Sequence, residues 1–226
     1  MVARRLAEAI RLGLLLDGER LPTESRLAAQ LGVSIVTARD ALATLRGMGL
    51  VETKRGRSGG SFVRSPGGSH SARLHAPLLR LSLHDVRDMG DHRAAIAGAA
   101  AMLAADRALE EDIGGLREHL ERLRAAEGLT QRRRADARLH IEIAAAAQSP
   151  RLTREEISLW SQIGDLLWLP LSRAQREVIA AVIAEHGELI DAIADEDGER
   201  ARDLASRHVN DETERLVNYR LRLGES

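Results

Sequence analysis

The 226 residues are 44% hydrophobic and 30% charged with a net charge of −1, a composition typical of a soluble protein with room for one large domain or two small ones. Cysteine is absent, which excludes disulfide bonds and metal sites built from thiolates. No apolar run approaches the ~20 residues that span a membrane, and the run at residues 12–16 is too short for a signal peptide, so we expect a cytoplasmic protein with no membrane partner.

The near-neutral total hides an uneven distribution of charge. Residues 1–66 hold 11 Lys and Arg against 6 Asp and Glu, whereas residues 67–226 hold 22 against 28. A basic N-terminal part suits contact with the phosphates of a nucleic acid. Most of the cations are arginine and alanine is abundant, which a GC-rich coding sequence also produces, so arginine content alone is no evidence for nucleic-acid binding.

The chain opens with an amphipathic helix predicted over residues 1–16, with three apolar residues on one side: Leu6, Ile10 and Leu14. A second helix follows a turn, and Thr23 is placed to cap its first free backbone N–H groups. We expect this helix to end at Gly32, because glycine readily takes the left-handed conformation found at helix C-termini.

A third helix is predicted to start after Ser34, which is placed as its N-cap, and its apolar residues are spaced i, i+4, i+7. Two short strands follow at residues 50–53 and 61–63, and the basic, glycine-rich tip between them suits phosphates or a minor groove. Helices joined by a tight turn and followed by such a hairpin indicate a winged helix-turn-helix, which places one helix in the major groove of DNA. We assign this DNA-binding domain to residues 1–65.

This stretch resembles the DNA-binding domain of GntR-family transcription regulators. The family pattern is L-P-S-E-x-x-L-A-x-x-L-G-V-S-R-x-x-V-R-E-A-L-x-x-L-x-x-x-G-L with a wing that ends in F-V, and most of it is present between residues 21 and 63. Ile35 stands where the family usually has arginine, and Ser25 stands where many FadR-like members have arginine. We therefore expect an operator that departs from the family's common half-site. The predicted DNA contacts are Ser25, Arg26, Ser34, Ile35, Thr37, Arg39, Lys54, Arg55, Arg57 and Gly59.

Residues 66–83 are predicted to be a linker and connector with a short helix, because proline, glycine and serine dominate its start. From residue 84 to 226 the chain shows only helical periodicity, which favours a bundle of antiparallel helices with short connections. The predicted helices span residues 84–107, 110–126, 130–148, 151–169, 173–195 and 198–222. The fold class is therefore mainly α, with a winged helix-turn-helix and small β-wing followed by an all-α bundle of about six helices.

Four polar residues fall on the apolar faces of three bundle helices: Asp136, His140, His186 and His208. A buried imidazole or carboxylate must be hydrogen-bonded, paired or bound to a metal. Taken singly, each histidine is more often a satisfied core residue than a ligand. Together they form a ligand set suited to a divalent cation such as Zn, Ni or Mn, with coordination positions left open.

This part of the chain resembles the FCD domain, the all-helical effector domain of the FadR branch. Metal-binding members carry D-x-x-x-H on one helix and one histidine on each of two later helices. Asp136 and His140 match the first motif, and His186 and His208 match the later positions. Leu139 replaces an aromatic residue that the family often has. The resemblance implies that residues 84–226 bind both a metal and an effector.

Arg93 lies within the apolar stripe of the first bundle helix, where an inward guanidinium suits a carboxylate. The family often has an effector-binding arginine here, while the alternative is an internal ion pair, for which Asp165 is one candidate. Trp160 and Trp168 lie about two turns apart on the fourth helix and are candidates for an effector pocket, although such residues are more often core.

We therefore expect a homodimeric transcription regulator, because two recognition helices must reach adjacent half-sites of a palindromic operator. Its predicted effector is a small organic acid bound by the metal and Arg93, and family behaviour implies repression relieved by that acid. A second hypothesis makes the metal itself the signal, without an organic effector. A third is a metal-dependent hydrolase with a DNA-binding module, but the chain carries no general-base, nucleophile or cofactor motif, so we do not expect an enzyme.

Overall fold

The computed structural model describes residues 1–12, 14–15, 17–54, 56, 59–64, 71–171 and 176–224, with only the backbone at 71–73. The chain divides into two compact units, Met1–Gly68 and Ser69–Ser226. The described part holds ten helices and one two-stranded antiparallel sheet, which confirms the predicted mainly α fold class. Within that same part, no helix has the length and apolar character needed to cross a bilayer.

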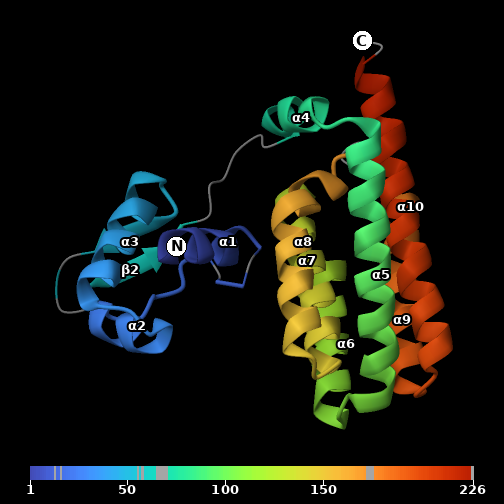
Figure 1. Cartoon of the computed structure of the whole chain (residues 1–226), viewed down its shortest axis with the longest axis horizontal. Coiled ribbons are helices and arrows are strands. Elements are labelled where there is room, and N and C mark those ends of the chain that lie inside the picture. The colour runs from blue at the N-terminus through green and yellow to red at the C-terminus, as the bar shows by residue number, and fades with distance from the viewer. Residues whose placement is uncertain are drawn as a thin grey trace. The chain divides into compact units, whose positions relative to one another are not determined.

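The first unit is a three-helix domain with a β-hairpin (Figure 1), made of α1 (Val2–Arg11), α2 (Glu24–Leu31), α3 (Ile35–Gly47), β1 (Val51–Lys54) and β2 (Gly60–Val63). One apolar core joins the three helices to the hairpin, whose register pairs Val51 with Val63. The predicted first helix is too long, because α1 ends at Arg11 and not at residue 16.

Local sequence signals set the helix ends around the turn between α2 and α3. Thr23 Oγ1 accepts a hydrogen bond from the Arg26 N–H at 3.4 Å, and Ser34 Oγ accepts one from the Thr37 N–H at 3.1 Å. Gly32 has a φ of +64°, a left-handed conformation that ends α2 at little steric cost. The predicted caps and turn are confirmed, and they fix where α3 begins on the surface of the unit.

The second unit is a helical bundle, made of α4 (Ser71–Arg80), α5 (Leu83–Arg107), α6 (Glu110–Ala125), α7 (Gly128–Ala146), α8 (Pro150–Leu167), α9 (Arg176–Ala194) and α10 (Gly198–Gly224). The six predicted bundle helices are all present, and their described ends differ from the predicted ends by up to two residues. The predicted start of the fifth helix, at residue 173, lies outside the described residues. Helix α4 is the short connector helix. Its Leu78 and Leu79 carbonyls accept hydrogen bonds from Arg220 of α10.

Helices α5 and α10 are the two longest and run side by side (Figure 1), in close contact along their length. Gly90 of α5 permits this approach, because a Cβ built there would lie 2.4 Å from Thr213 Cγ2 of α10. The pair carries Arg93 and His208, so its spacing determines the geometry of the bundle interior.

Replacing Gly90 by alanine is expected to lower the free energy of unfolding of the bundle by about 1–3 kcal/mol, the usual cost of overpacking. Gly114→Ala in α6 is the matched control, because a Cβ there meets no heavy atom within 4 Å, and it should stabilise the helix by roughly 0.5–1 kcal/mol. Urea unfolding followed by tryptophan fluorescence measures both, since both tryptophans lie in the bundle. Equal effects of the two substitutions would contradict the close approach.

Candidate metal centre and DNA interface

The four residues predicted as metal ligands meet in the interior of the bundle. Asp136 and His140 lie one turn apart on α7, His186 lies on α9 and His208 on α10, and each is at most 4% exposed. One ring nitrogen from each histidine lies within 4.8 Å of the others. Asp136 Oδ1 is 2.9 Å from His186 Nε2 and 3.7 Å from His140 Nε2. The packing of α7, α9 and α10 thus brings together groups up to 72 residues apart in the chain.

Hydrogen bonds on the outer side of the cluster orient two of the imidazoles. His186 Nδ1 lies 2.9 Å from the Val182 carbonyl oxygen, and His208 Nδ1 lies 2.7 Å from Glu185 Oε2. A proton on Nδ1 leaves the lone pair on Nε2, which is the arrangement found behind metal-bound histidines. Both rings are therefore held with Nε2 directed into the cluster.

At the centre, His208 Nε2 has no hydrogen-bond partner among the described residues, and Asp136 Oδ1 faces two imidazole nitrogens, His186 Nε2 at 2.9 Å and His140 Nε2 at 3.7 Å. The other oxygen of Asp136 accepts a bond from the Trp168 indole at 2.8 Å. A buried polar atom left in this state is costly unless an ion or ligand engages it. The ligand set, its burial and these two atoms fit a divalent cation.

The electrostatics of the cluster favour deprotonated ligands at two of the four residues. Burial lowers the pKa of His140 well below its ordinary value, so the ring is neutral and available to a metal. Burial acts to raise the pKa of Asp136, but the hydrogen bond and positive charge of His186 outweigh it and the pKa is lowered. Burial likewise disfavours the charged ring of His186, yet the Asp136 carboxylate raises its pKa.

Arg93 is 1% exposed on α5 and takes part in an internal ion pair. Its Nη2 donates to Glu212 Oε2 at 3.0 Å, and its guanidinium lies 5.1 Å from the Trp160 ring centre. The suggested pairing with Asp165 is wrong, because Asp165 pairs instead with Arg133 on the neighbouring helix α7. Arg93 Nε and Nη1 have no hydrogen-bond partner among the described residues, so the guanidinium retains donors for a further anion.

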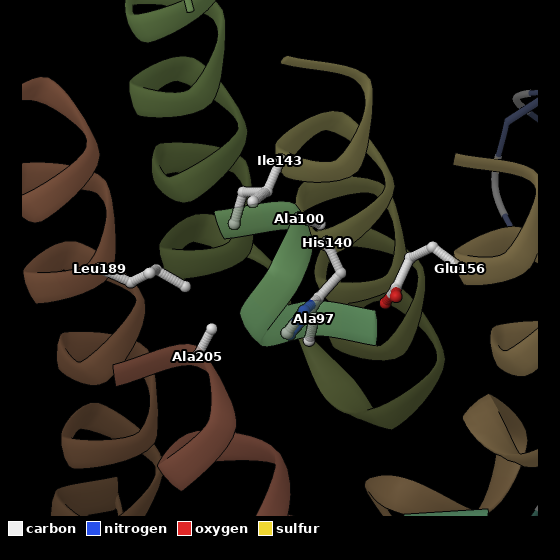
Figure 2. Close-up of a pocket in the computed structure, with 7 residues that line it drawn as sticks. All are labelled: Ala97, Ala100, His140, Ile143, Glu156, Leu189 and Ala205. Atoms are coloured by element: carbon white, nitrogen blue, oxygen red, sulfur yellow. The ribbon is translucent and has the colours of Figure 1, made fainter. Parts of the chain in front are cut away.

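A small cavity of about 10 Å³ lies beside His140, with Glu156 of α8 on its other side and alanine and aliphatic residues around it (Figure 2). That volume is close to the space of one water-sized group. Glu156 is 2% exposed, its Oε1 accepts from the Trp160 indole at 2.9 Å, and its Oε2 is unpartnered among the described residues. The two tryptophans are thus buried hydrogen-bond donors to Glu156 and Asp136.

Three carboxylates next to the cluster were not predicted from the sequence: Glu156, Glu185 and Glu212. Two of them carried a usable signal, since Glu156 lies four residues before Trp160 and Glu212 four residues after His208, which puts each pair on one helix face. Glu185 adjoins His186 in sequence but holds His208 of a different helix, a pairing that sequence spacing does not reveal.

Burial raises the pKa of Glu156 to about 7, although the Arg93 charge and the Trp160 hydrogen bond act to lower it. The folded protein therefore keeps a proton that the unfolded chain loses near pH 4.5. The contribution of Glu156 to folding stability therefore falls as pH rises from 4.5 through 7, by about 3 kcal/mol at 1.36 kcal/mol per pKa unit.

Glu156→Gln should remove this pH dependence. We expect the metal-free variant to match the wild type in unfolding free energy near pH 4.5 and to exceed it by about 2–3 kcal/mol at pH 8. Glu155→Gln, at the half-exposed neighbouring position, is the control and should show little difference at either pH. A Glu156→Gln effect that is the same at both pH values would contradict a raised pKa. Urea unfolding of the chelated proteins supplies the free energies.

The predicted DNA-contacting residues that the structure describes lie on the surface of α2, α3 and the wing. Ser25 and Arg26 are exposed on α2, and Thr37 and Arg39 on α3. Ile35 and its neighbour Val36 are large apolar side chains, yet they are 49% and 63% exposed. Exposed apolar groups at the start of a recognition helix suit contact with thymine methyls.

Several of these side chains are oriented by bonds within the unit. Arg39 Nε donates to Glu24 Oε2 at 2.8 Å, and Lys54 Nζ lies 3.3 Å from Glu52 Oε1 and 4.9 Å from the centre of the Phe62 ring. Arg20 Nη2 donates to the carbonyl of Gly59 at 2.6 Å, which ties the base of the wing to the turn before α2. The predicted contacts Arg55 and Arg57 lie outside the described residues.

Comparison with known proteins gives two domain matches. Residues 1–63 match the gntR family of bacterial regulatory proteins, and residues 88–211 match the FCD domain. The chain belongs to the GntR family. The HTH-type transcriptional regulator RmpR of Mycobacterium gastri is 41% identical over 223 residues, which cover 99% of this chain and 81% of RmpR. The predicted family, with its FCD-type second domain, is confirmed.

More distant relatives of this GntR-family chain agree with that assignment. The transcriptional regulator LutR of Bacillus subtilis is 25% identical over 219 residues, covering 93% of this chain and 97% of LutR. McbR/YncC of Escherichia coli has the same fold, with a TM-score of 0.58 at 21% identity over 96% of each chain. The chain is therefore a DNA-binding transcription regulator and not an enzyme, which removes the hydrolase hypothesis.

Proposed function

We propose that the bundle of this regulator binds a divalent metal ion and a small carboxylate, and that carboxylate binding changes the affinity of the winged helix-turn-helix for its operator. The observation that carries the metal site is the convergence of three buried imidazoles on the Asp136 carboxylate, with His208 Nε2 left without a hydrogen-bond partner among the described residues. A divalent ion held there supplies open positions to a carboxylate oxygen. Zn, Ni and Mn all suit these ligands.

Arg93 supports the carboxylate part of the proposal. Its unpartnered Nε and Nη1 lie in the same interior as the histidines, and a guanidinium grips a carboxylate through two parallel hydrogen bonds. Trp160 holds the guanidinium against its ring and donates to Glu156. In this arrangement Arg93 orients the acid, while the surrounding alanine and aliphatic side chains exclude water.

A second candidate function is metal sensing without an organic effector. It is favoured by the Arg93–Glu212 ion pair, which already satisfies one face of the guanidinium, and by a cavity of only about 10 Å³. Titrating metal into chelator-treated protein bound to labelled operator separates the two functions. If operator affinity changes with metal concentration when no acid is present, the metal is the signal. If operator affinity changes only when a carboxylate is added, the carboxylate is the signal.

For DNA recognition we propose a homodimer on a palindromic operator, with one α3 in the major groove of each half-site. Relief of repression is the response that the resemblance favours. A coupling of about 1–3 kcal/mol between effector and operator would give a useful switch. A thermal-shift screen of small carboxylic acids against metal-loaded protein tests the effector, and the absence of any stabilising acid would contradict it.

The Ile35→Arg substitution is expected to change which operator sequence is selected. The wild-type side chain favours a thymine methyl, whereas arginine bonds guanine bidentately, and such a contact discriminates by about 1–3 kcal/mol at one base pair. Site selection from a random DNA pool should give motifs that differ at one base pair per half-site. Gln30→Arg, on the exposed face of α2, is the control for added charge; if both variants keep the wild-type motif, Ile35 does not read DNA.

A further inference from the structure

The interior of the bundle contains a carboxylate in the place proposed for the effector. Glu212 is 4% exposed on α10, one helical turn after His208, and so shares its face. It belongs neither to the predicted ligand set nor to the hydrogen bonds that orient the histidines. A buried carboxylate requires compensating charge, and its surroundings show where that charge comes from.

The two oxygens of Glu212 face two different groups. Oε2 accepts the hydrogen bond from Arg93 Nη2 at 3.0 Å, and Oε1 lies 3.8 Å from His208 Nε2. That nitrogen is the unpartnered atom that the Glu185 hydrogen bond leaves for a metal. Glu212 therefore spans the gap between the guanidinium and the proposed ion.

The 3.8 Å separation is compatible with one ion bound by both residues. Zinc lies about 2.0–2.1 Å from an imidazole nitrogen and about 2.0–2.2 Å from a carboxylate oxygen, so two such ligands of one ion lie at most about 4.3 Å apart. Oε1 and Nε2 fall within that limit without any change of rotamer. A carboxylate that joins a cation to a guanidinium is also the arrangement proposed for the effector.

We propose that Glu212 is a further ligand of the metal and acts as an internal substitute for the effector carboxylate. This inference rests on the proposed metal site. A carboxylate effector binds by displacing Glu212 Oε1 from the ion, and it takes Arg93 Nε and Nη1 as its own donors. The displacement breaks the connection that runs from the ion through Glu212 of α10 to Arg93 of α5, the two longest helices. Effector binding thereby alters the contact that joins them.

The test uses Co²⁺ as the metal and acetate as the carboxylate probe, on the full-length chain. Glu212→Gln keeps the shape and a hydrogen-bond acceptor for Arg93 but is a poor ligand. We expect Co²⁺ affinity, measured by chelator competition, to fall at least about 10-fold, and the visible spectrum of bound Co²⁺ to change. Acetate should bind the loaded variant at least about 10-fold more tightly than the loaded wild type, because it no longer competes with Glu212.

Glu214→Gln, an exposed position two residues along α10, is the matched control and should leave all three readouts unchanged. If the folded Glu212→Gln variant has the same Co²⁺ affinity, visible spectrum and acetate affinity as the wild type, the inference is overturned. If the variant does not fold, a crystal structure of the Co²⁺-loaded wild type decides, since the inference requires both Asp136 and Glu212 to bind the ion, and an ion bound by Asp136 but not by Glu212 would refute it. A wild type that binds no Co²⁺ would instead contradict the metal site itself.

Discussion

Replacing His186 by alanine is expected to weaken divalent-metal binding at least about 100-fold. Loss of groups that only orient a ligand costs about 10–100-fold in metal affinity, so loss of a ligand should cost no less. His186 is the central residue of the cluster, because its Nε2 lies 2.9 Å from Asp136 Oδ1 and 3.3 Å from His140 Nε2. Its removal takes away one of three imidazoles and leaves Asp136 without its nearest positive partner.

The measurement is competition between the protein and a chelator of known affinity for the same ion. His92→Ala is the control, since His92 is 51% exposed and pairs with Glu155 on the surface. Circular dichroism of each variant checks that the bundle is folded. A His186→Ala protein that competes as well as the control would show that the histidines form a hydrogen-bonded core and no metal centre.

Replacing Arg93 by methionine is expected to destabilise the metal-free bundle by about 3–5 kcal/mol. The guanidinium and the Glu212 carboxylate are both almost fully buried, and removing one partner of such a pair leaves the other charge uncompensated. Arg93 also acts to lower the pKa of Glu156, so in the variant Glu156 should hold its proton to higher pH. The loss of stability is measured by urea unfolding in the presence of chelator.

The double variant Arg93→Met/Glu212→Leu separates charge from packing. Replacing a whole buried ion pair by apolar residues is often neutral or stabilising, so the double variant should recover most of the stability lost in Arg93→Met. Recovery of stability in the double variant would assign the loss in Arg93→Met to the unpaired Glu212 charge. A single variant as stable as the wild type would contradict the buried charge pair.

The local structure of the DNA-binding unit could be predicted from the sequence because its signals act over a few residues. Thr23 and Ser34 cap helices with side chains that reach three residues ahead, and Gly32 adopts the left-handed conformation that glycine favours. The first helix was predicted too long, since Leu12 and Leu14 continue the apolar pattern beyond the point where α1 ends at Arg11. Apolar periodicity does not by itself mark where a helix stops.

The candidate metal site could be predicted because each ligand breaks the apolar face of a long helix, and such a residue must find a buried partner. What periodicity cannot give is the partner on another helix. Arg93 pairs with Glu212, 119 residues away, and not with Asp165, because the packing of α5 against α10 decides which carboxylate it meets. Glu185 was missed for the same reason, since its partner His208 lies on the next helix.

The metal content of the 226-residue protein decides whether the bundle holds a metal ion. The protein is stripped with chelator, reloaded in turn with Zn, Ni, Mn and Co, desalted and assayed by mass spectrometry for metal. We expect about one ion per chain with at least one of these metals, and loss of that ion in His186→Ala but not in His92→Ala. A folded wild-type protein that retains less than one ion per chain with each of the four metals would contradict the proposed metal centre.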